Sequence, residues 1–280
     1  MPTPVGKGVD PVNANRRADP RGAQAGRDAD DGDETERAGG RLETTRPGVR
    51  GCRTGERTRR TSMIIESRFH GPAESGNGGW SAGIFAAAVD DRGPVEVTLR
   101  RPPPLETPLT ALDGEVRDPA GQLVAEVRRV EAFTAVVPPV DRPTADAAAK
   151  AYPGLVEHPF PGCYVCGPEN PAGLRIFPGR LPDGRTAAPF RAPAEVVPAT
   201  VWAALDCPGG WAVIAPGRPY VLGRIAAVVR ALPRPGDECV VTGASVGGAG
   251  RKAEVHSSLY GPGGDLLGYA RATWIALPPP

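Results

Sequence analysis

One segment of the chain predicts a helix without a polar face: Asn77-Gly78-Gly79-Trp80-Ser81-Ala82-Gly83-Ile84-Phe85-Ala86-Ala87-Ala88-Val89. Asn77 is a good N-cap residue, because its side chain can accept a hydrogen bond from the first free N–H groups of a helix. From Trp80 to Val89 almost every side chain is apolar or small. A helix that is apolar on all sides must be buried, typically by a sheet that wraps around it. We therefore expect a core helix over 80–89.

A second segment of the same kind follows much later in the chain: Pro198-Ala199-Thr200-Val201-Trp202-Ala203-Ala204-Leu205-Asp206. Pro198 suits the first turn of a helix, where its missing N–H costs nothing. Asp206 is the only acid within either apolar helix.

Strand-like segments surround both helices and are separated by Gly- and Pro-rich turns. Before residue 136 we expect strands over 63–69, 94–101, 105–116 and 122–133. After residue 161 we expect a hairpin of 174–181 and 185–190, then strands over 220–231, 238–246, 252–260 and 265–277. Between them, 136–161 is dominated by proline, alanine and charge, which is typical of a linker.

The two halves repeat one order: strand, buried helix, antiparallel meander. Both also contain the same P-x-G-x-L step, Pro119-Ala120-Gly121-Gln122-Leu123 and Pro262-Gly263-Gly264-Asp265-Leu266, at the same place in the order. This pattern indicates an internal duplication, with a first half that is one strand shorter than the second.

Residues 1–62 contain no aromatic residue and few large apolar ones. Such a stretch cannot offset roughly 1–2 kcal/mol of backbone ordering per residue, so we expect a disordered tail. Three interpretations of this stretch stay open. It could be an Arg-rich interaction arm, an extension without function, or upstream sequence that is wrongly translated, with Met63 as the true start. The expected domains are the tail (1–62), a first half (63–135), a linker (136–161) and a second half (162–280).

Composition excludes several classes of partner. The formal net charge is only +1, so no overall charge draws the chain to nucleic acid. No apolar run approaches the ~20 residues that cross a bilayer. The five cysteines are odd in number and sparse, unlike a secreted disulfide framework. We expect a cytoplasmic protein without a membrane span.

Two groups of motifs resemble known thioesterases. The first group resembles the N-terminal half of type II acyl-CoA thioesterase-like proteins. It consists of Phe69-His70-Gly71-Pro72, then Ser75-Gly76-Asn77-Gly78-Gly79-Trp80, and then Val95-Glu96-Val97-Thr98-Leu99-Arg100-Arg101-Pro102. The second group resembles the segment that opens many single hotdog thioesterases. It is Cys163-Tyr164-Val165-Cys166-Gly167-Pro168-Glu169-Asn170-Pro171-Ala172-Gly173-Leu174. Over 63–277 the resemblance implies an α+β tandem (double) hotdog, in which antiparallel sheets each wrap around a central buried helix. It also implies an acyl-CoA or other acyl thioester as substrate.

Thioester hydrolysis needs a carboxylate and N–H donors for the oxyanion. The helix start at Asn77, Gly78 and Gly79 offers such donors, although these glycines can equally serve close packing. Hotdog thioesterases that carry an acid on the central helix use it as base or nucleophile, and Asp206 resembles that acid. Alternatively, Asp206 ends a short helix before Pro208 and accepts a local hydrogen bond. Because each half lacks what the other has, we predict one composite site between the halves.

The remaining motifs point to no cofactor. Cys163 and Cys166 have the C-x-x-C spacing of half a zinc site, but no second pair exists and nothing in the sequence fixes a histidine beside them. We interpret them as part of a turn and expect no metal; Cys207 and Cys239 are interpreted as core residues. No phosphate-binding loop, dinucleotide fingerprint or Gly-x-Ser-x-Gly elbow is present.

Four further questions stay open at this level. A non-catalytic acyl-binding or assembly protein and a dehydratase or hydratase are the competing functions, and a second copy of the chain (a homo-oligomer) is a candidate partner. Trp80 and Trp202 supply core volume or line an acyl tunnel, with core packing favoured. The arginines near strands, Arg100, Arg101, Arg224 and Arg230, could meet a CoA phosphate.

Overall fold

The computed structural model describes residues 60–88 and 93–278. The predicted tail therefore lies outside the described residues up to residue 59, as does Val89 at the end of the predicted first helix. The helices are α1 (Gly78–Ala86), α2 (Arg142–Lys150), α3 (Pro198–Ala204) and α4 (Cys207–Trp211). The strands are β1 (Thr61–Met63), β2 (Val95–Leu99), β3 (Leu109–Leu112), β4 (Glu115–Arg117), β5 (Leu123–Arg129), β6 (Gly179–Arg180), β7 (Thr186–Arg191), β8 (Tyr220–Val229), β9 (Glu238–Ala249), β10 (Lys252–Tyr260) and β11 (Leu266–Ala276).

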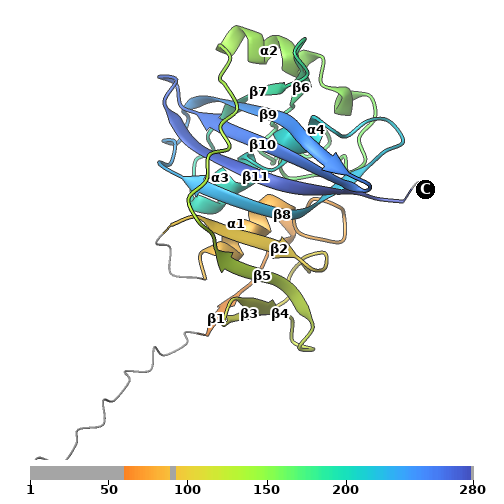
Figure 1. The fold of residues 1–280 in the computed structure, drawn as a ribbon, viewed down its shortest axis with the longest axis vertical. Helices are drawn as coiled ribbons and strands as arrows, with labels where there is room; N and C mark the ends of the chain where they lie inside the picture. Colours follow the sequence, from red (N-terminus) through yellow and green to blue (C-terminus); the bar gives the residue numbers. More distant parts are fainter. Residues whose placement is uncertain (1–59, 89–92, 279–280) are drawn as a thin grey trace, which may run out of the picture. The chain divides into compact units, whose positions relative to one another are not determined.

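The eleven strands form one antiparallel sheet in the order β1-β3-β4-β5-β2-β8-β11-β10-β9-β7-β6. From its outer edge inward, the first half has the order β1-β3-β4-β5-β2. After its edge strand β6, the second half has the matching order β7-β9-β10-β11-β8. The innermost strands, β2 and β8, pair at the junction. In Figure 1 the two halves are continuous through β2 and β8, where Val97 pairs with Ile225. The expected α+β class and tandem arrangement are confirmed, and the two expected sheets are joined into one. The second half adds only β6 at its outer edge.

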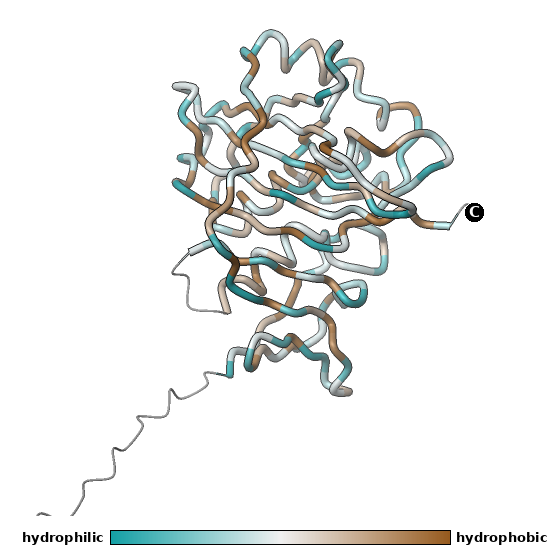
Figure 2. The backbone as a smooth tube through the Cα atoms, viewed as in Figure 1, coloured by the Kyte–Doolittle hydropathy of each residue, from teal (hydrophilic) through white to brown (hydrophobic). Residues whose placement is uncertain are grey.

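Helices α1 and α3 pack against each other beneath the junction of the halves. Gly83 faces Ala199 so closely that a Cβ at position 83 would lie 2.7 Å from the Ala199 Cα. The predicted burial of both apolar helices is confirmed, since Phe85 and Val201 are fully buried. In Figure 2 the α1–α3 region and the strands that cover it carry many apolar (brown) residues, as burial on one face of a sheet requires.

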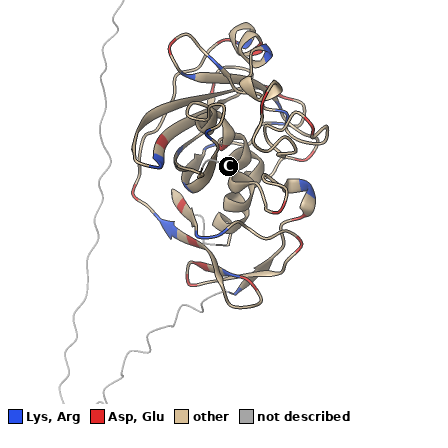
Figure 3. Ribbon diagram, turned by 90° about the vertical axis from the view of Figure 1, so that its right-hand side faces the viewer, with Lys and Arg blue, Asp and Glu red and all other residues tan. Residues whose placement is uncertain are grey.

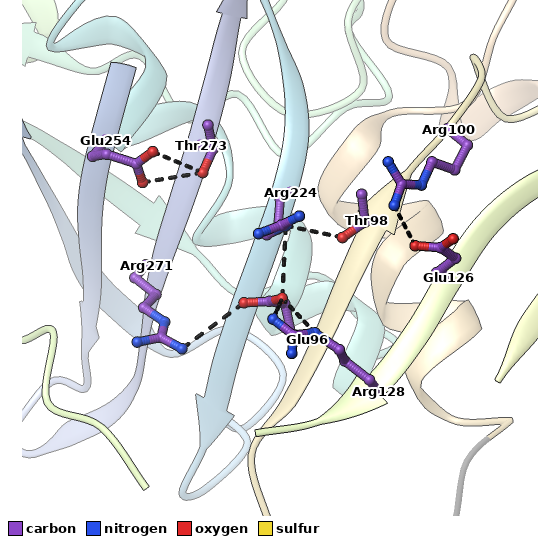
Figure 4. A network of polar contacts seen from close by, with 9 residues as sticks. All are labelled: Glu96, Thr98, Arg100, Glu126, Arg128, Arg224, Glu254, Arg271 and Thr273. Atoms are coloured by element: carbon purple, nitrogen blue, oxygen red, sulfur yellow. Dashed lines mark hydrogen bonds and ion pairs between the residues drawn. The ribbon is translucent and has the colours of Figure 1, made fainter. Parts of the chain in front are cut away.

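On the other face of the junction, a buried acid holds four strands together. Glu96 of β2 pairs with Arg128 of β5 at 2.6 Å, with Arg224 of β8 at 3.6 Å and with Arg271 of β11 at 3.8 Å (Figure 4). Two of these arginines come from the second half, so this ion network links the two halves across the shared sheet.

Several predicted elements were wrong in extent. The strand expected over 105–116 is two strands, because Asp113 and Gly114 have φ of 52° and 78° and form a tight hairpin turn. The strand expected over 63–69 ends at Met63 and is followed by a 3₁₀ turn, Ser67–Phe69. Of the strand expected over 174–181, only Gly179–Arg180 forms.

The segment expected as a linker, 136–161, contains a helix that the sequence analysis missed. Asp141 caps α2 by accepting from the Thr144 N–H at 2.8 Å, and Pro143 occupies its first turn. Ala145 and Ala148 are buried on the side of the helix that faces β6 and β7. A short alanine-rich helix of this kind leaves only a weak hydrophobic pattern in the sequence, because its buried face consists of methyl groups only.

Charged residues of both signs are interspersed along the strands and loops in the view of Figure 3. Within the described part of the chain, no helix is both long enough and apolar enough to cross a membrane.

Candidate functional site

Asp206 lies at the junction between α3 and α4. Helix α3 ends at Ala204, and Pro208, which lacks an N–H, stands in the first turn of α4. The carboxylate makes no capping bond to α4. It is 2% exposed, so the chain places an acid in the core at the break between two helices.

The Asp206 carboxylate meets the start of α1, 127 residues away in the sequence. Its Oδ2 accepts from the Gly79 N–H at 2.8 Å and from the Asn77 Nδ2 at 3.3 Å. Its Oδ1 is buried and has no hydrogen-bond partner among the described residues. Burial raises the pKa of Asp206 to about 7, against the opposing effect of the Gly79 hydrogen bond. Asp206 does follow the end of a short helix, as the alternative interpretation expected, but the local hydrogen bond expected there is wrong, because the bonds go to the start of α1.

Asn77 has two functions in this geometry. Its Oδ1 accepts from the Trp80 N–H at 2.9 Å, which confirms the predicted N-cap, while its Nδ2 points to Asp206. The same Asn77 side chain therefore caps α1 and contacts the acid.

The two glycines permit close contacts that any side chain would block. A Cβ on Gly79 would lie 2.5 Å from the Asp206 Cβ, and a Cβ on Gly78 would lie 2.8 Å from the Leu222 Cδ2. The packing role considered for these glycines is therefore real. It coexists with a polar one, because the Gly79 N–H binds Asp206. No hydrogen bond of the Gly78 N–H is found within the described residues.

Helix α4 is fixed beneath the sheet and holds Asp206 in place. The Gly209 N–H donates to the Ser257 Oγ at 3.0 Å, and the Thr186 hydroxyl donates to the Pro208 carbonyl at 2.7 Å. Gly243 of β9 lies so close to α4 that a Cβ there would be 2.3 Å from the Pro208 backbone. These contacts leave α4, and with it the position of Asp206, little room to shift.

A cavity of about 500 Å³ opens beside this carboxylate, and Asn77, Gly78 and Asp206 line one part of it. Leu222, Trp211 and Trp274 line the apolar part. This volume is within the range of small-molecule sites. Trp80 and Trp202 are buried outside the cavity lining, and Trp80 stacks on Phe69 at 3.7 Å. Those two tryptophans are core residues, and the aromatic wall comes from two others.

Of the four arginines considered for a CoA phosphate, Arg100 and Arg101 line this cavity. Arg100 is paired with Glu126, and Arg224 with Glu96 and Thr98. Arg230 lies over the ring of Tyr269. Arg101 is exposed, and its guanidinium has no hydrogen bond or ion pair within the described ranges.

Three cysteines meet in the same cavity wall. The Sγ atoms of Cys163, Cys166 and Cys207 lie within 4.8 Å of one another, and all three are buried and free. Hydrogen bonds from the Cys166 and Cys207 thiols lower the pKa of Cys163 well below its usual value. Sequence reasoning missed Cys207 as a member of this group, because it is 41 positions from Cys166 and had no recognisable spacing to it.

His158 lies next to these thiols. Its Nε2 is 3.4 Å from the Cys166 Sγ, and its Nδ1 accepts from the Phe160 N–H at 2.9 Å. Burial lowers the pKa of His158, which favours the neutral ring. Because Nδ1 accepts, the single ring proton is on Nε2 and points to the sulfur.

Comparison with known proteins identifies the fold. No protein-family model matches the sequence, and no curated protein matches it significantly. Among solved structures, a "putative thioesterase" from Novosphingobium aromaticivorans aligns with a TM-score of 0.53 and 16% identity, over 78% of this chain and 96% of that chain.

Two further structures align over the same extent. The tesB protein of Mycobacterium avium subs paratuberculosis has a TM-score of 0.52 and 14% identity, over 78% of this chain and 93% of that one. A conserved protein of unknown function with a hot dog fold from Alicyclobacillus acidocaldarius has a TM-score of 0.50 and 15% identity, over 79% and 94%. The described chain has the hotdog fold in its double form.

Proposed function

We propose that this double hotdog chain hydrolyses acyl thioesters, acyl-CoA in particular, at the single composite site formed by Asp206, Asn77, Gly78 and Gly79. The observation that carries the proposal is the contact between the Gly79 N–H and the Asp206 Oδ2, which joins a helix start of one half to the buried acid of the other. The likeness to structures named as thioesterases supports it.

In this proposal Asp206 is the general base. Oδ2 is held by the Gly79 N–H and the Asn77 amide, and Oδ1 is buried without a partner among the described residues. Asp206 as a residue lines the cavity. Oδ1 takes a proton from a water that reaches it from the cavity and attacks the thioester carbonyl. When the C–S bond breaks, Asp206 returns that proton to the departing sulfur, which gives the acid and the free thiol and restores the carboxylate.

The geometry divides the roles of the two glycines. The Gly79 N–H is already bonded to Asp206, so Gly79 positions the base. The Gly78 N–H, at the start of α1 and at the cavity wall, is the donor for the developing oxyanion, helped by the helix dipole.

The site does not support a dehydratase in which a histidine works beside the acid. His158 is the histidine at this cavity, and both of its ring nitrogens are engaged, with Phe160 and with Cys166.

The test is a hydrolysis screen over acyl-CoA chain lengths with detection of the free thiol, on the wild-type protein and on Asp206→Asn. We expect turnover of part of the panel and a loss of about 10²–10⁴-fold in kcat for the variant. Asp118→Asn, at an exposed turn away from the cavity, is the matched control and should hydrolyse at the wild-type rate.

Equal rates for wild-type protein and Asp206→Asn would refute the role of Asp206. Saturable acyl-CoA binding with no turnover anywhere in the panel would instead leave an acyl-binding protein.

A further inference from the structure

Three sulfur atoms from two distant parts of the chain converge at one point of the cavity wall. Cys163 and Cys166 come from the turn before β6, and Cys207 is the first residue of α4. Their Sγ atoms all lie within 4.8 Å of one another. Three ligands around one tetrahedral zinc ion, with Zn–S distances of about 2.3 Å, would place their sulfurs about 3.8 Å apart. The cluster therefore needs only small side-chain movements to match that arrangement.

The surroundings of the sulfurs suit thiolates. The Asn77 Nδ2 lies 3.6 Å from the Cys163 Sγ, and the His158 Nε2, which carries the ring proton, lies 3.4 Å from the Cys166 Sγ. N–H groups that point at sulfur are the outer-shell contacts that hold metal-bound ligands in orientation.

His158 itself stands outside the donor set. Its Nδ1 is occupied as an acceptor, so Nε2 has no free electron pair for a metal. Three protein ligands and an open fourth position are the arrangement of zinc sites that keep room for water or a ligand.

We propose that Cys163, Cys166 and Cys207 bind one zinc ion in the wall of the cavity that Asp206 also lines. Soft thiolate donors select zinc over magnesium, calcium or manganese. Each thiol that becomes a ligand releases its proton to solvent, so binding leaves the sulfurs as thiolates around the cation. Because all three cysteines line the cavity that Asp206 also lines, the fourth coordination position is reached from that cavity. This proposal replaces the expectation of a metal-free turn.

The first experiment measures metal content of the full chain, purified without chelator after expression with added zinc. We expect about one zinc per chain by elemental analysis, and cobalt substitution should give the intense near-ultraviolet absorption of thiolate-to-cobalt charge transfer. Each of Cys163→Ser, Cys166→Ser and Cys207→Ser should lower zinc affinity at least tenfold. Cys239→Ser is the matched control, since Cys239 is a buried free cysteine of β9 outside the cluster, and it should retain the metal.

A second measurement needs no variant and so does not depend on whether a substituted chain folds. Alkylation of the wild-type protein, read by mass spectrometry, should show Cys163, Cys166 and Cys207 protected by zinc and modified after chelation. Zinc-free protein that cannot be loaded, protection of other cysteines only, or a disulfide between Cys163 and Cys166 would each overturn the proposal. The readouts are independent of hydrolysis: Asp206→Asn should lose activity and keep the metal.

Discussion

At the scale of single residues, Asp206 is an acid that its neighbours satisfy on one oxygen only. Oδ2 has two donors, whereas Oδ1 is buried without a partner in the described structure. A buried polar atom without a partner costs about 1–3 kcal/mol, so a purely structural role would favour a less costly side chain. Stability sacrificed at a reactive group is typical of functional sites.

Asp206→Asn should therefore separate stability from activity. The asparagine oxygen can still accept from the Gly79 N–H, and no charge has to be buried. We expect the free energy of unfolding in urea to rise, or to fall by less than about 1 kcal/mol, while hydrolysis is lost. A large loss of stability would instead mark Asp206 as a structural residue.

Arg101 is the arginine of the cavity that has no partner within the described residues. A phosphate of CoA would supply one, so Arg101→Ala should raise KM for acyl-CoA about tenfold, equivalent to about 1.4 kcal/mol. KM for an acyl thioester without phosphates should stay unchanged. Arg191→Ala, an exposed arginine on β7 away from the cavity, is the control. Equal changes for both thioesters would refute a phosphate contact.

At the scale of elements, the start of α1 combines a helix cap with a contact to the acid. Asn77 caps α1 through Oδ1 and reaches Asp206 through Nδ2. Capping the helix needs only the first of these two contacts.

Asn77→Ser should separate these two tasks. A serine hydroxyl can still cap the helix, so unfolding stability should change by less than about 1 kcal/mol, but the donor to Asp206 is lost. We expect a clear fall in kcat with a nearly unchanged melting temperature. Asn77→Ala, which loses both contacts, should reduce both quantities; a serine variant with full activity would show that the amide is dispensable.

The contact of α1 with α3 depends on Gly83. A side chain there would meet Ala199, with a Cβ 2.7 Å from its Cα, so Gly83→Val should destabilise the fold by about 1–3 kcal/mol or more. Ala87→Val, at the exposed C-cap of the same helix, should cost much less. Similar melting temperatures for the two variants would contradict this packing.

At the scale of the whole molecule, the two halves share one sheet, and the candidate site takes residues from both. The β2–β8 pairing, the α1–α3 contact and the Glu96 network all cross from one half to the other. Each half therefore buries part of its surface only in the presence of the other, and the proposed composite site needs both halves.

Glu96→Gln tests the polar link between the halves. The three arginines are 44–63% exposed in their side chains, so water can solvate them when the carboxylate is removed. We expect a loss of about 1–3 kcal/mol in unfolding free energy, smaller than for a fully buried pair. Glu126→Gln, which breaks the exposed pair with Arg100, should cost less than about 1 kcal/mol. A neutral Glu96→Gln would show that the network does not contribute.

Local sequence patterns were sufficient for the features that local physics governs. The apolar run of α1 predicts burial, Asn77 predicts its cap, and the alternating strands β8 to β11 agree with their predicted positions to within three residues. The sequence also contains the signal for the Asp113-Gly114 turn, since this pair favours tight hairpins, but the turn was not predicted.

Tertiary structure alone decided how the distant parts meet. The Asp206 contact with Gly79 spans 127 residues, and Cys207 joins the C-x-x-C pair only because α4 is fixed under β9 and β10. Such contacts leave no periodicity or spacing in the sequence, since they arise when the two halves of the sheet pack on a shared core. The sequence by itself determined two buried helices and a candidate acid; the folded chain determined that the acid and the helix start are in contact.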